Sequence, residues 1–458
     1  MVVQHNMQAA NANRMLNVTT SAQSKSTEKL SSGYRINRAA DDAAGLTISE
    51  KMRKQIKGLD RASTNAEDGV SAVQTAEGAL TEVHSMLQRM NELATQSANG
   101  TNSNTDRKAI QDEIDQLTTE IDRVSETTKF NETYLLKGDG AEKAHNVNAH
   151  DAGLDGVTLT DKGDTVDVTL KTLNAGDKIS IAGKNYTIGA TTADAQKIVD
   201  AQKVDGKTVT VNGTTYTYKT NQWTNADGSA VTGSITIKGG DVVSDGTKTL
   251  TAMKDGANAA GADGIDDNDS TVITAGKAYQ LQTAEIVKAS SIGTDTAAAV
   301  KNGANADKDA TATFTLNKGT VSYKDALSFN LHVGADADMT NKITVNIDSM
   351  NSAGLGVKGI KADTEQDATY AIDAIADAIS TVSSQRSALG AVQNRLEHTI
   401  NNLDNVVENT TSAESRIRDT DMAEEMVNYS KNNILAQAGQ SMLAQANQSN
   451  QGVLSLLQ

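Results

Sequence analysis

The sequence predicts an α+β protein in which long helices at both ends of the chain enclose a β-rich middle. Apolar residues recur at every seventh position before residue 100 and again after residue 370, which is typical of coiled-coil-like helices. Residues 141–325 lack this period and are rich in Thr, Gly, Asp and Ala, with strand-like runs between turns. Only 3% of the 458 residues are aromatic, so thin helical bundles and small sheets are expected.

The first long helix is predicted over about residues 43–98, roughly 80 Å in length at ~1.5 Å per residue. One heptad position is apolar in every repeat: Met52, Leu59, Ala66, Val73, Leu80, Leu87 and Ala94. Asp41 and Asp42 precede this helix and can cap its first turn. A turn at residues 97–104 then leads into a second helix, with apolar residues at Ile110, Ile114, Leu117, Ile121 and Val124.

A third long helix is predicted in the last third of the chain. Its apolar heptad positions are Ile375, Val382, Leu389, Leu396 and Leu403. The three helices can share one apolar seam. Because the third comes from the far end of the chain, the two terminal regions are expected to lie together.

The middle contains hairpin signals. Asn212-Gly213 separates two alternating runs within residues 208–218, and residues 179–188 have the same form 30 positions earlier. These two copies suggest a duplicated hairpin. Two further strands, at residues 327–333 and 343–347, predict another hairpin just before the C-terminal helix.

The outermost segments carry weak amphipathic stripes that would be marginal as isolated helices in water. Such termini need partners and therefore point to self-assembly. The residues expected to take part in polymerisation are Val3, Met7, Leu16, Leu30, Ile434, Leu435, Met442, Leu443, Leu454 and Leu457.

Composition argues against several classes of function. The formal net charge of −16 disfavours nucleic acid as a partner, because phosphate binding relies on basic patches. Cysteine is absent, which excludes disulfides, thiolate catalysis and Cys-ligated zinc. No apolar run approaches the ~20 residues of a membrane span, and the first residues do not have the pattern of a cleaved secretory signal.

Several motifs resemble those of the bacterial flagellin family. The N-terminal ones are residues 30–37 (LSSGYRIN), 41–46 (DDAAGL), 74–80 (QTAEGAL) and 87–93 (LQRMNEL). Residues 446–448 (ANQ) and 453–457 (VLSLL) look like the family's tail. The resemblance covers about residues 1–140 and 325–458. Tyr34 departs from it, because the family commonly has Leu there.

The resemblance implies a division of the chain. Residues 1–33 and 420–458 would be axial-core helices lining a filament channel. Residues 34–140 and 326–419, including the hairpin, would form a surrounding helical tube, and residues 141–325 would be variable, surface-exposed outer domains. The function implied is that of the structural subunit of the flagellar filament for swimming motility. The alternative is a hook–filament junction (hook-associated) protein, which shares the terminal helices.

The resemblance also implies partners and a location. The chain would form a helical homopolymer outside the cell, in the flagellum, after type III export without a cleaved signal. An export chaperone would bind the C-terminal helix, and the filament cap and hook-associated proteins would contact the polymer. Toll-like receptor 5 would bind the monomer at positions matching Arg89, Leu93 and Glu113, which are expected to be exposed beside the seam.

No enzymatic activity, cofactor or metal is expected. None of the six histidines begins a His-Glu-x-x-His motif, so a zinc-peptidase site is disfavoured, and His145 and His150 are interpreted as loop histidines. The acidic run at residues 263–269 does not have EF-hand spacing and is interpreted as a solvated turn. Asp41 and Asp42 are interpreted as helix caps rather than a catalytic pair.

Overall fold

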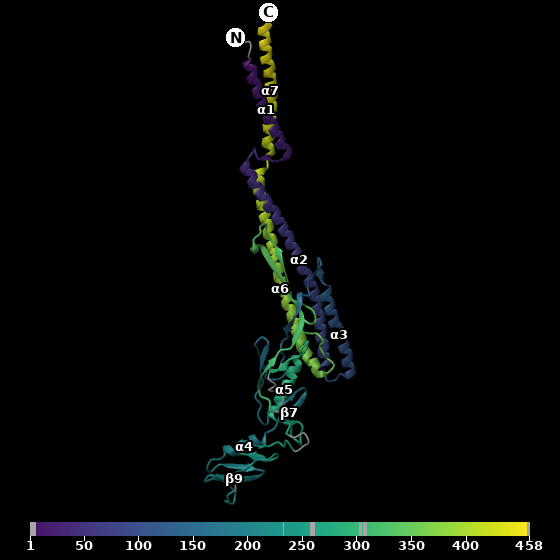
Figure 1. Ribbon diagram of the computed structural model, residues 1–458, viewed down its shortest axis with the longest axis vertical. Helices are drawn as coiled ribbons and strands as arrows, with labels where there is room; N and C mark the ends of the chain where they lie inside the picture. The colour runs from purple at the N-terminus through teal and green to yellow at the C-terminus, as the bar shows by residue number, and fades with distance from the viewer. Residues whose placement is uncertain (1–5, 232, 257–261, 302–304, 306–308, 456–458) are drawn as a thin grey trace. The chain divides into compact units, whose positions relative to one another are not determined.

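The computed structural model describes residues 6–231, 233–256, 262–301, 305 and 309–455, with side chains described as far as residue 448. The predicted α+β class is confirmed: long helices form both terminal regions of the sequence (Figure 1), and the described strands all come from residues 129–347, between these helices in sequence order. The chain divides into two compact units. The first comprises residues 1–71, 330–344 and 392–458, and the second comprises residues 72–329 and 345–391.

The helices are, in chain order, α1 (Met7–Ser32), α2 (Ala43–Ser97), α3 (Asn104–Thr127), α4 (Thr192–Ala201), α5 (Ala275–Ala289), α6 (Glu365–Arg418) and α7 (Met422–Ser455). The predicted helices at 43–98 and after residue 104 are therefore confirmed within a residue or two. Two short helices, α4 and α5, were not predicted. None of the helices described here is both long enough and apolar enough to cross a membrane.

In the first unit, α1 and α7 lie side by side (Figure 1). Helix α1 ends at Gly33, whose φ of 77° allows its N–H to reach the Lys29 carbonyl oxygen at 2.8 Å. The connections that leave the two helices are joined to each other. Arg35 N donates to Arg418 O at 2.7 Å, and Thr420 N donates to Gly33 O at 3.0 Å.

Tyr34, the departure from the family pattern, has a contact of its own in this connection. The Arg418 guanidinium carbon lies 4.7 Å from the centroid of the Tyr34 ring, within the range of a cation–π interaction. Arg418 also forms an ion pair with Glu50 at 3.0 Å. Tyr34 therefore packs against a partly buried charge that also binds helix α2.

The two aspartates before α2 have different roles. Asp42 caps the helix, because its Oδ1 accepts a hydrogen bond from Gly45 N at 2.8 Å. Asp41 does not: its Oδ2 accepts from Asn37 N and Arg38 N and so closes the preceding turn. The prediction that both cap the helix is thus correct only for Asp42.

The predicted seam is present in both units. In the first unit, Leu59 and Ala62 of α2 pack with Leu403 of α6, and Ala66 packs with Leu396. The hairpin of β17 (Leu327–His332) and β18 (Lys342–Ile347) was also predicted, and its Ile343 joins the same core. In the second unit the heptad residues are buried as well: Val73, Leu80, Leu87, Ala94, Ile375, Val382 and Leu389.

Helix α3 begins with a capping box in which Ser103 and Asp106 bond reciprocally. Arg107, although charged, is buried in the turn before it and donates to the carbonyl oxygens of Ser97, Asn99 and Asn102. This turn returns α3 alongside α2. Ile110, Ile114 and Ile121 are buried as predicted, whereas Leu117 and Val124 are half-buried.

The strands of residues 129–325 are β1 (Lys129–Phe130), β2 (Thr133–Tyr134), β3 (Asp139–Asn146), β4 (Thr158–Asp161), β5 (Thr165–Thr169), β6 (Lys178–Ile181), β7 (Lys184–Ile188), β8 (Thr208–Val211), β9 (Thr214–Lys219), β10 (Gln222–Thr224), β11 (Val242–Ser244), β12 (Thr249–Thr251), β13 (Val272–Ile273), β14 (Ala299–Val300), β15 (Thr313–Asn317) and β16 (Thr320–Asp325). Their sheets have the orders β1-β2, β16-β3, β14-β15-β5-β4, β13-β7-β6 and β10-β9-β8-β11-β12.

Two separate cores lie in this middle region. One is formed by α5 with the β13-β7-β6 and β14-β15-β5-β4 sheets and includes Val168, Ile273, Ile286 and Leu316. The other is formed by α4 with the five-stranded sheet and is centred on the buried Val199, Val209, Trp223 and Val243. The second core belongs to residues 191–252, which we call the insert module.

Both members of the predicted duplicated hairpin are confirmed. β8 pairs with β9 across Asn212-Gly213, and β6 pairs with β7 across Ala182-Gly183. All four turn residues have positive φ, the requirement of a type I′ turn. The two hairpins do not pack together, because they belong to different sheets.

Candidate assembly surface on the terminal helices

The candidate functional site is the pair of terminal helices, α1 and α7, which run antiparallel. Asn6 Nδ2 donates to Ala446 O at 3.2 Å near one end, and Lys29 forms an ion pair with Glu425 at 3.7 Å near the other. Between these contacts, Leu16 of α1 faces Gly439 of α7, where an added Cβ would lie 3.4 Å from Leu16 Cδ1, an ordinary van der Waals distance. The two helices therefore pack against each other at this point.

This pair leaves much of its apolar surface in solvent. Nine large apolar side chains are exposed on the two helices: Met7, Met15, Val18, Met422, Met426, Val427, Ile434, Leu435 and Met442. Ala436 is the one apolar residue of α7 that is buried among those whose side chains are described. Single exposed apolar side chains are common, but nine large ones on one helix pair, three of which line a shared groove, indicate an interaction surface.

A groove of about 730 Å³ runs between the two helices. Its apolar lining comes from Ala12, Met15, Leu16, Leu435, Ala438, Gly439 and Met442, and amides such as Gln8 and Gln445 lie at its margin. None of the described residues that line it is charged. A groove of this composition suits an apolar helix face rather than a charged ligand.

Most of the predicted polymerisation residues lie on this surface. Met7, Ile434, Leu435 and Met442 are exposed, with Ile434 at 67%. Leu16, Leu30 and Leu443 are half-buried between the helices. Val3 and Leu457 lie outside the described residues, and Leu454 lies in α7 but its side chain is not described. Sequence reasoning missed Met15, Met422, Met426 and Val427; the four-residue spacing of Met422 and Met426 was the available signal.

The residues predicted to bind a receptor lie in the second unit. Arg89 and Glu113 are half-exposed, and Arg89 Nε donates to Glu113 Oε1 at 2.9 Å, while Glu92 accepts from Arg89 Nη1 at 3.2 Å. Hydrogen bonds to Glu113 and Glu92 raise the pKa of the Arg89 guanidinium. Leu93, however, is only 2% exposed, so its expected exposure is wrong. It points into the core because it falls three residues after the buried Met90 and belongs to the same helix face.

The histidines considered as metal ligands make ordinary structural interactions instead. No cluster of three or more potential metal ligands occurs among the described residues. His145 was expected in a loop but lies on β3, where its ring stacks on Tyr323 at 4.0 Å and its Nε2 lies 3.3 Å from Asp325. His150 is in the loop that follows.

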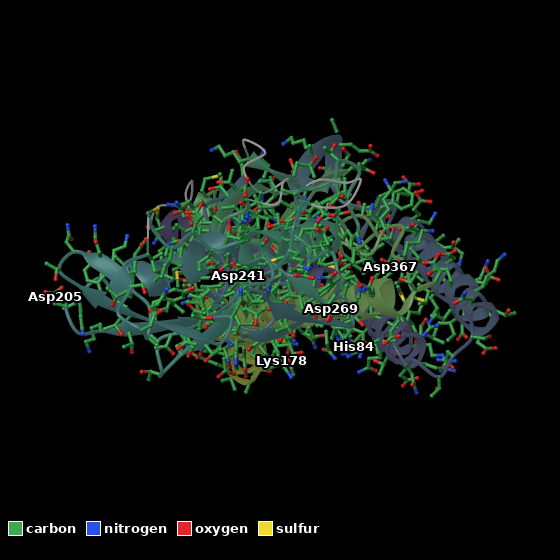
Figure 2. The ribbon with its side chains drawn as sticks, turned by 90° about the horizontal axis from the view of Figure 1, so that it is seen from below. His84, Lys178, Asp205, Asp241, Asp269 and Asp367 are labelled. Atoms are coloured by element: carbon green, nitrogen blue, oxygen red, sulfur yellow. The ribbon has the colours of Figure 1, made fainter. Side chains whose placement is uncertain are left out.

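The acidic run is a series of turns. Asp263, Asp266 and Asp269 each accept hydrogen bonds from backbone N–H groups two or three residues later. Such local bonds stabilise turns and occupy the carboxylates. Figure 2 labels Asp269 together with Asp205 and Asp241, which precede strands of the insert module. Asp241 likewise accepts from Lys238 N and Asn212 Nδ2.

The terminal helices and the β-rich middle define a class: a structural subunit with an apolar terminal surface suited to self-association. The N-terminal part, residues 3–141, matches the family described as the bacterial flagellin N-terminal helical region. Residues 372–457 match the bacterial flagellin C-terminal helical region. The chain belongs to the bacterial flagellin family.

Proteins similar over their whole length support this assignment. The chain is 42% identical to the flagellin of Clostridium tyrobutyricum over 457 residues, covering 98% of this chain and all of that protein. It is 36% identical to flagellin C of Vibrio cholerae and 34% identical to flagellin B of Vibrio anguillarum, with 99% of each chain covered. The solved structure of FliC from Burkholderia pseudomallei covers 71% of this chain and 99% of its own at 17% identity, with a TM-score of 0.28, which is too low for a structural comparison.

The predicted function is thereby confirmed at the level of the family. This chain is a subunit of the extracellular bacterial flagellar filament, a structural polymer used in motility. Because the full-length likeness is to flagellins, the alternative of a hook–filament junction protein is not favoured.

Proposed function

We propose that this chain polymerises through the exposed apolar faces of α1 and α7. The observation that supports the proposal is the row of large apolar side chains that the pair leaves uncovered, including Ile434 and Leu435 on α7. Burial of such side chains contributes ~1.5–3 kcal/mol each, so several of them together can drive association. Copies of the same pair can cover one another with their own apolar faces.

The test introduces a charge into this surface. Ile434→Asp and Leu435→Asp place a carboxylate where burial against a second copy is proposed, and desolvation of that charge should prevent seeded elongation. Val204→Asp is a matched control, because Val204 is a similarly exposed apolar residue in the insert module. Elongation would be followed by light scattering. Normal elongation of both terminal variants would exclude the proposed surface.

The division of the chain follows from the same proposal. Residues 1–33 and 420–458 form the axial core of the filament, residues 34–140 and 326–419 form the helical tube, and residues 141–325 form the outer domains. The breaks between α1 and α2, and between α6 and α7, support the inner boundary. Residues 31–45 act as the connection, supported by the hydrogen bonds between Gly33, Arg35, Arg418 and Thr420.

The same surface suits the partners that the family resemblance implies. An export chaperone covers the exposed apolar face of α7 before type III export, and the filament cap and hook-associated proteins contact the terminal helices at the two ends of the polymer. A chaperone pull-down tests this directly. Binding to the full chain should be lost from a chain that ends at residue 428, and undiminished binding to the shortened chain would contradict the assignment.

Recognition by Toll-like receptor 5 is proposed for the Arg89–Glu113 pair. Both side chains are half-exposed and carry the multi-donor and carboxylate groups common in protein interfaces. Leu93 supports this surface from beneath, since it is buried. Arg89→Ala should weaken binding of the monomer to the receptor ectodomain by about 1–3 kcal/mol. Unchanged affinity in both Arg89→Ala and Glu113→Ala, with folding intact, would return the pair to an ordinary helix-surface ion pair.

We also propose that the chain has no enzymatic activity. His145 stacks on Tyr323, His398 is exposed, and the carboxylates of the acidic run accept backbone hydrogen bonds in turns, so these groups do not form a nucleophile–base arrangement. A test is hydrolysis of casein with and without added zinc. Zinc-dependent proteolysis by the purified protein would contradict the proposal.

A further inference from the structure

Methionine is concentrated on the exposed surface of the terminal helices. Of the nine exposed large apolar side chains there, five are methionines: Met7, Met15, Met422, Met426 and Met442. Methionines elsewhere are mostly covered: Met90, Met253 and Met350 are buried. The exception is Met339, which is exposed in the β17–β18 connection. Thioethers are the most readily oxidised side chains of a chain that lacks cysteine.

Two of these methionines share one site. Met15 of α1 and Met442 of α7 both line the apolar groove, on opposite helices, with Leu16 and Leu435 beside them. Their side chains are 58% and 61% exposed, so dissolved oxidants can reach both sulfur atoms in the free subunit. In the part of the chain whose side chains are described, the groove has no charged lining residue.

We propose that Met15 and Met442 form an oxidation-sensitive modification site that controls whether a free subunit can join the filament. This inference rests on the proposed function, because it requires the groove surface to be covered on assembly. The modifying reagent is a two-electron oxidant, namely a peroxide. The sulfur lone pair attacks one peroxide oxygen, the O–O bond breaks, a sulfoxide forms, and the other oxygen leaves as water after proton transfer.

The consequence follows from polarity. A sulfoxide replaces a polarisable apolar group with a strong hydrogen-bond acceptor. In the free subunit this oxygen is hydrated, so oxidation changes the stability of the α1–α7 pair little. On assembly the hydration is removed, and the two oxygens enter a surface that packs apolar side chains. Two such penalties should slow seeded elongation by roughly a hundredfold.

The site discriminates between free and assembled protein. In a free subunit the two thioethers are open to solvent, whereas in a filament the neighbouring copies cover them. Oxidation should therefore block new subunits and spare existing polymer. Reduction of the sulfoxides by methionine sulfoxide reductases should restore the blocked subunits, since each sulfoxide epimer has its own reductase.

The experiment treats full-length monomer with hydrogen peroxide, removes the peroxide and measures elongation from untreated seeds. Each protein is compared with its own untreated rate. Peptide mapping identifies which methionines carry an added oxygen. Wild type should lose roughly a hundredfold in rate, with sulfoxides at Met15 and Met442. The double variant Met15→Leu, Met442→Leu should lose less than about threefold, because leucine conserves volume and cannot be oxidised.

Met339 supplies the matched control. It is more exposed than either groove methionine but lies outside the terminal helices, so Met339→Leu should leave the peroxide sensitivity as in wild type. Adding both reductases with a thiol reductant to oxidised wild type should restore the rate.

Three results would overturn the inference: normal elongation of a monomer mapped as oxidised at both positions, equal sensitivity of the double leucine variant, or no recovery after reduction. Failure of the proposed function looks different. In that case Ile434→Asp and Leu435→Asp would elongate normally without any oxidant.

Discussion

The terminal helices and the insert module differ in how far they bury their large apolar residues. In residues 191–252, α4 covers the five-stranded sheet, and Val199, Val209, Trp223 and Val243 are all buried within the module. The α1–α7 pair, in contrast, exposes nine large apolar side chains. One region buries its large apolar residues within the module, and the other leaves many of its large apolar residues exposed in the single chain.

The difference follows from geometry. A helix on a sheet encloses a core on two sides, so a short segment can bury its own apolar residues. Two antiparallel helices contact along one stripe only, and the remaining faces are open. We therefore expect changes in the terminal helices to affect assembly and changes in the insert module to affect local stability.

The largest expected effect comes from removing the last 30 or so residues, from about Tyr429. This deletion takes away Ile434, Leu435 and Met442 and leaves α1 without its neighbour, so filaments should not form at any concentration. Negative-stain electron microscopy measures the outcome. The control replaces residues 191–252 with a short Gly/Ser bridge, which should leave filaments intact. Regular filaments from the truncated chain would show that the terminal helices, like the insert module, are not needed for assembly.

A second prediction concerns the core of the insert module. Val243→Ala should lower the stability of this module by about 2–3 kcal/mol, because Val243 is fully buried between α4 and the sheet. The single tryptophan, Trp223, lies in the same core and reports its unfolding by fluorescence. Val242→Ala is the matched control, since Val242 faces solvent on the same strand. A comparable loss of module stability in both variants would contradict a self-contained module. Loss of filament assembly in Val243→Ala would contradict it as well.

A smaller effect is expected at the first hairpin turn. Ala182 has a φ of 56°, a left-handed conformation that costs an L-residue about 1 kcal/mol. Ala182→Gly should therefore stabilise the β6–β7 hairpin by up to about 1 kcal/mol, and Ala182→Val should destabilise it. Thermal unfolding followed by circular dichroism can compare them. Changes of the same sign in both variants would show that the backbone conformation is not the cause.

The smallest predicted effect depends on pH. Burial raises the pKa of Asp373 on α6 above its ordinary value of 3.8, and repulsion from Asp151 and Asp377 adds to this, while His150 opposes it. The folded state then holds this proton to a higher pH than the unfolded state. Stability from Asp373 is thus fully present below pH 3.8 and is lost as pH rises through the raised value.

Asp373→Asn should accordingly be more stable than wild type near pH 7, by less than about 1 kcal/mol, and the difference should shrink on acidification toward pH 4. Urea unfolding at several pH values measures it. Asp205→Asn, at an exposed turn, is the control and should show no such trend. A gain that grows on acidification would have the wrong sign and would refute the assignment.

The helices and hairpins were predictable because their signals are local and periodic. The heptad residues Leu80, Leu87, Ile375 and Val382 are buried as their spacing predicted. Asn212-Gly213 marked the expected hairpin, and both residues have the positive φ values of a type I′ turn. Helices α4 and α5 were missed because each is short and lies among Thr- and Gly-rich residues that resemble strand and turn sequence.

The site was predictable in outline but not in residue detail. The stripes of Ile434, Leu435 and Met442 indicated an exposed surface, but the groove joins residues more than 400 positions apart, a pairing that no local pattern specifies. Leu93 is a case in which a local pattern was present but was not followed. Its position three residues after the apolar Met90 was a signal for burial, but its exposure was expected from the family resemblance instead.

The ends of the insert module have a consequence for how this family member can change. Ala190 and Ala252 are partners in a parallel bridge, and Met253 N donates to Ala190 O at 2.9 Å, so the chain leaves and re-enters the neighbouring sheet at one point. A segment with adjacent ends can be lengthened, exchanged or lost without moving β7 or β13. The insert module can therefore change in length or sequence at this one point of the chain, while the neighbouring strands and the terminal helices keep their own residues.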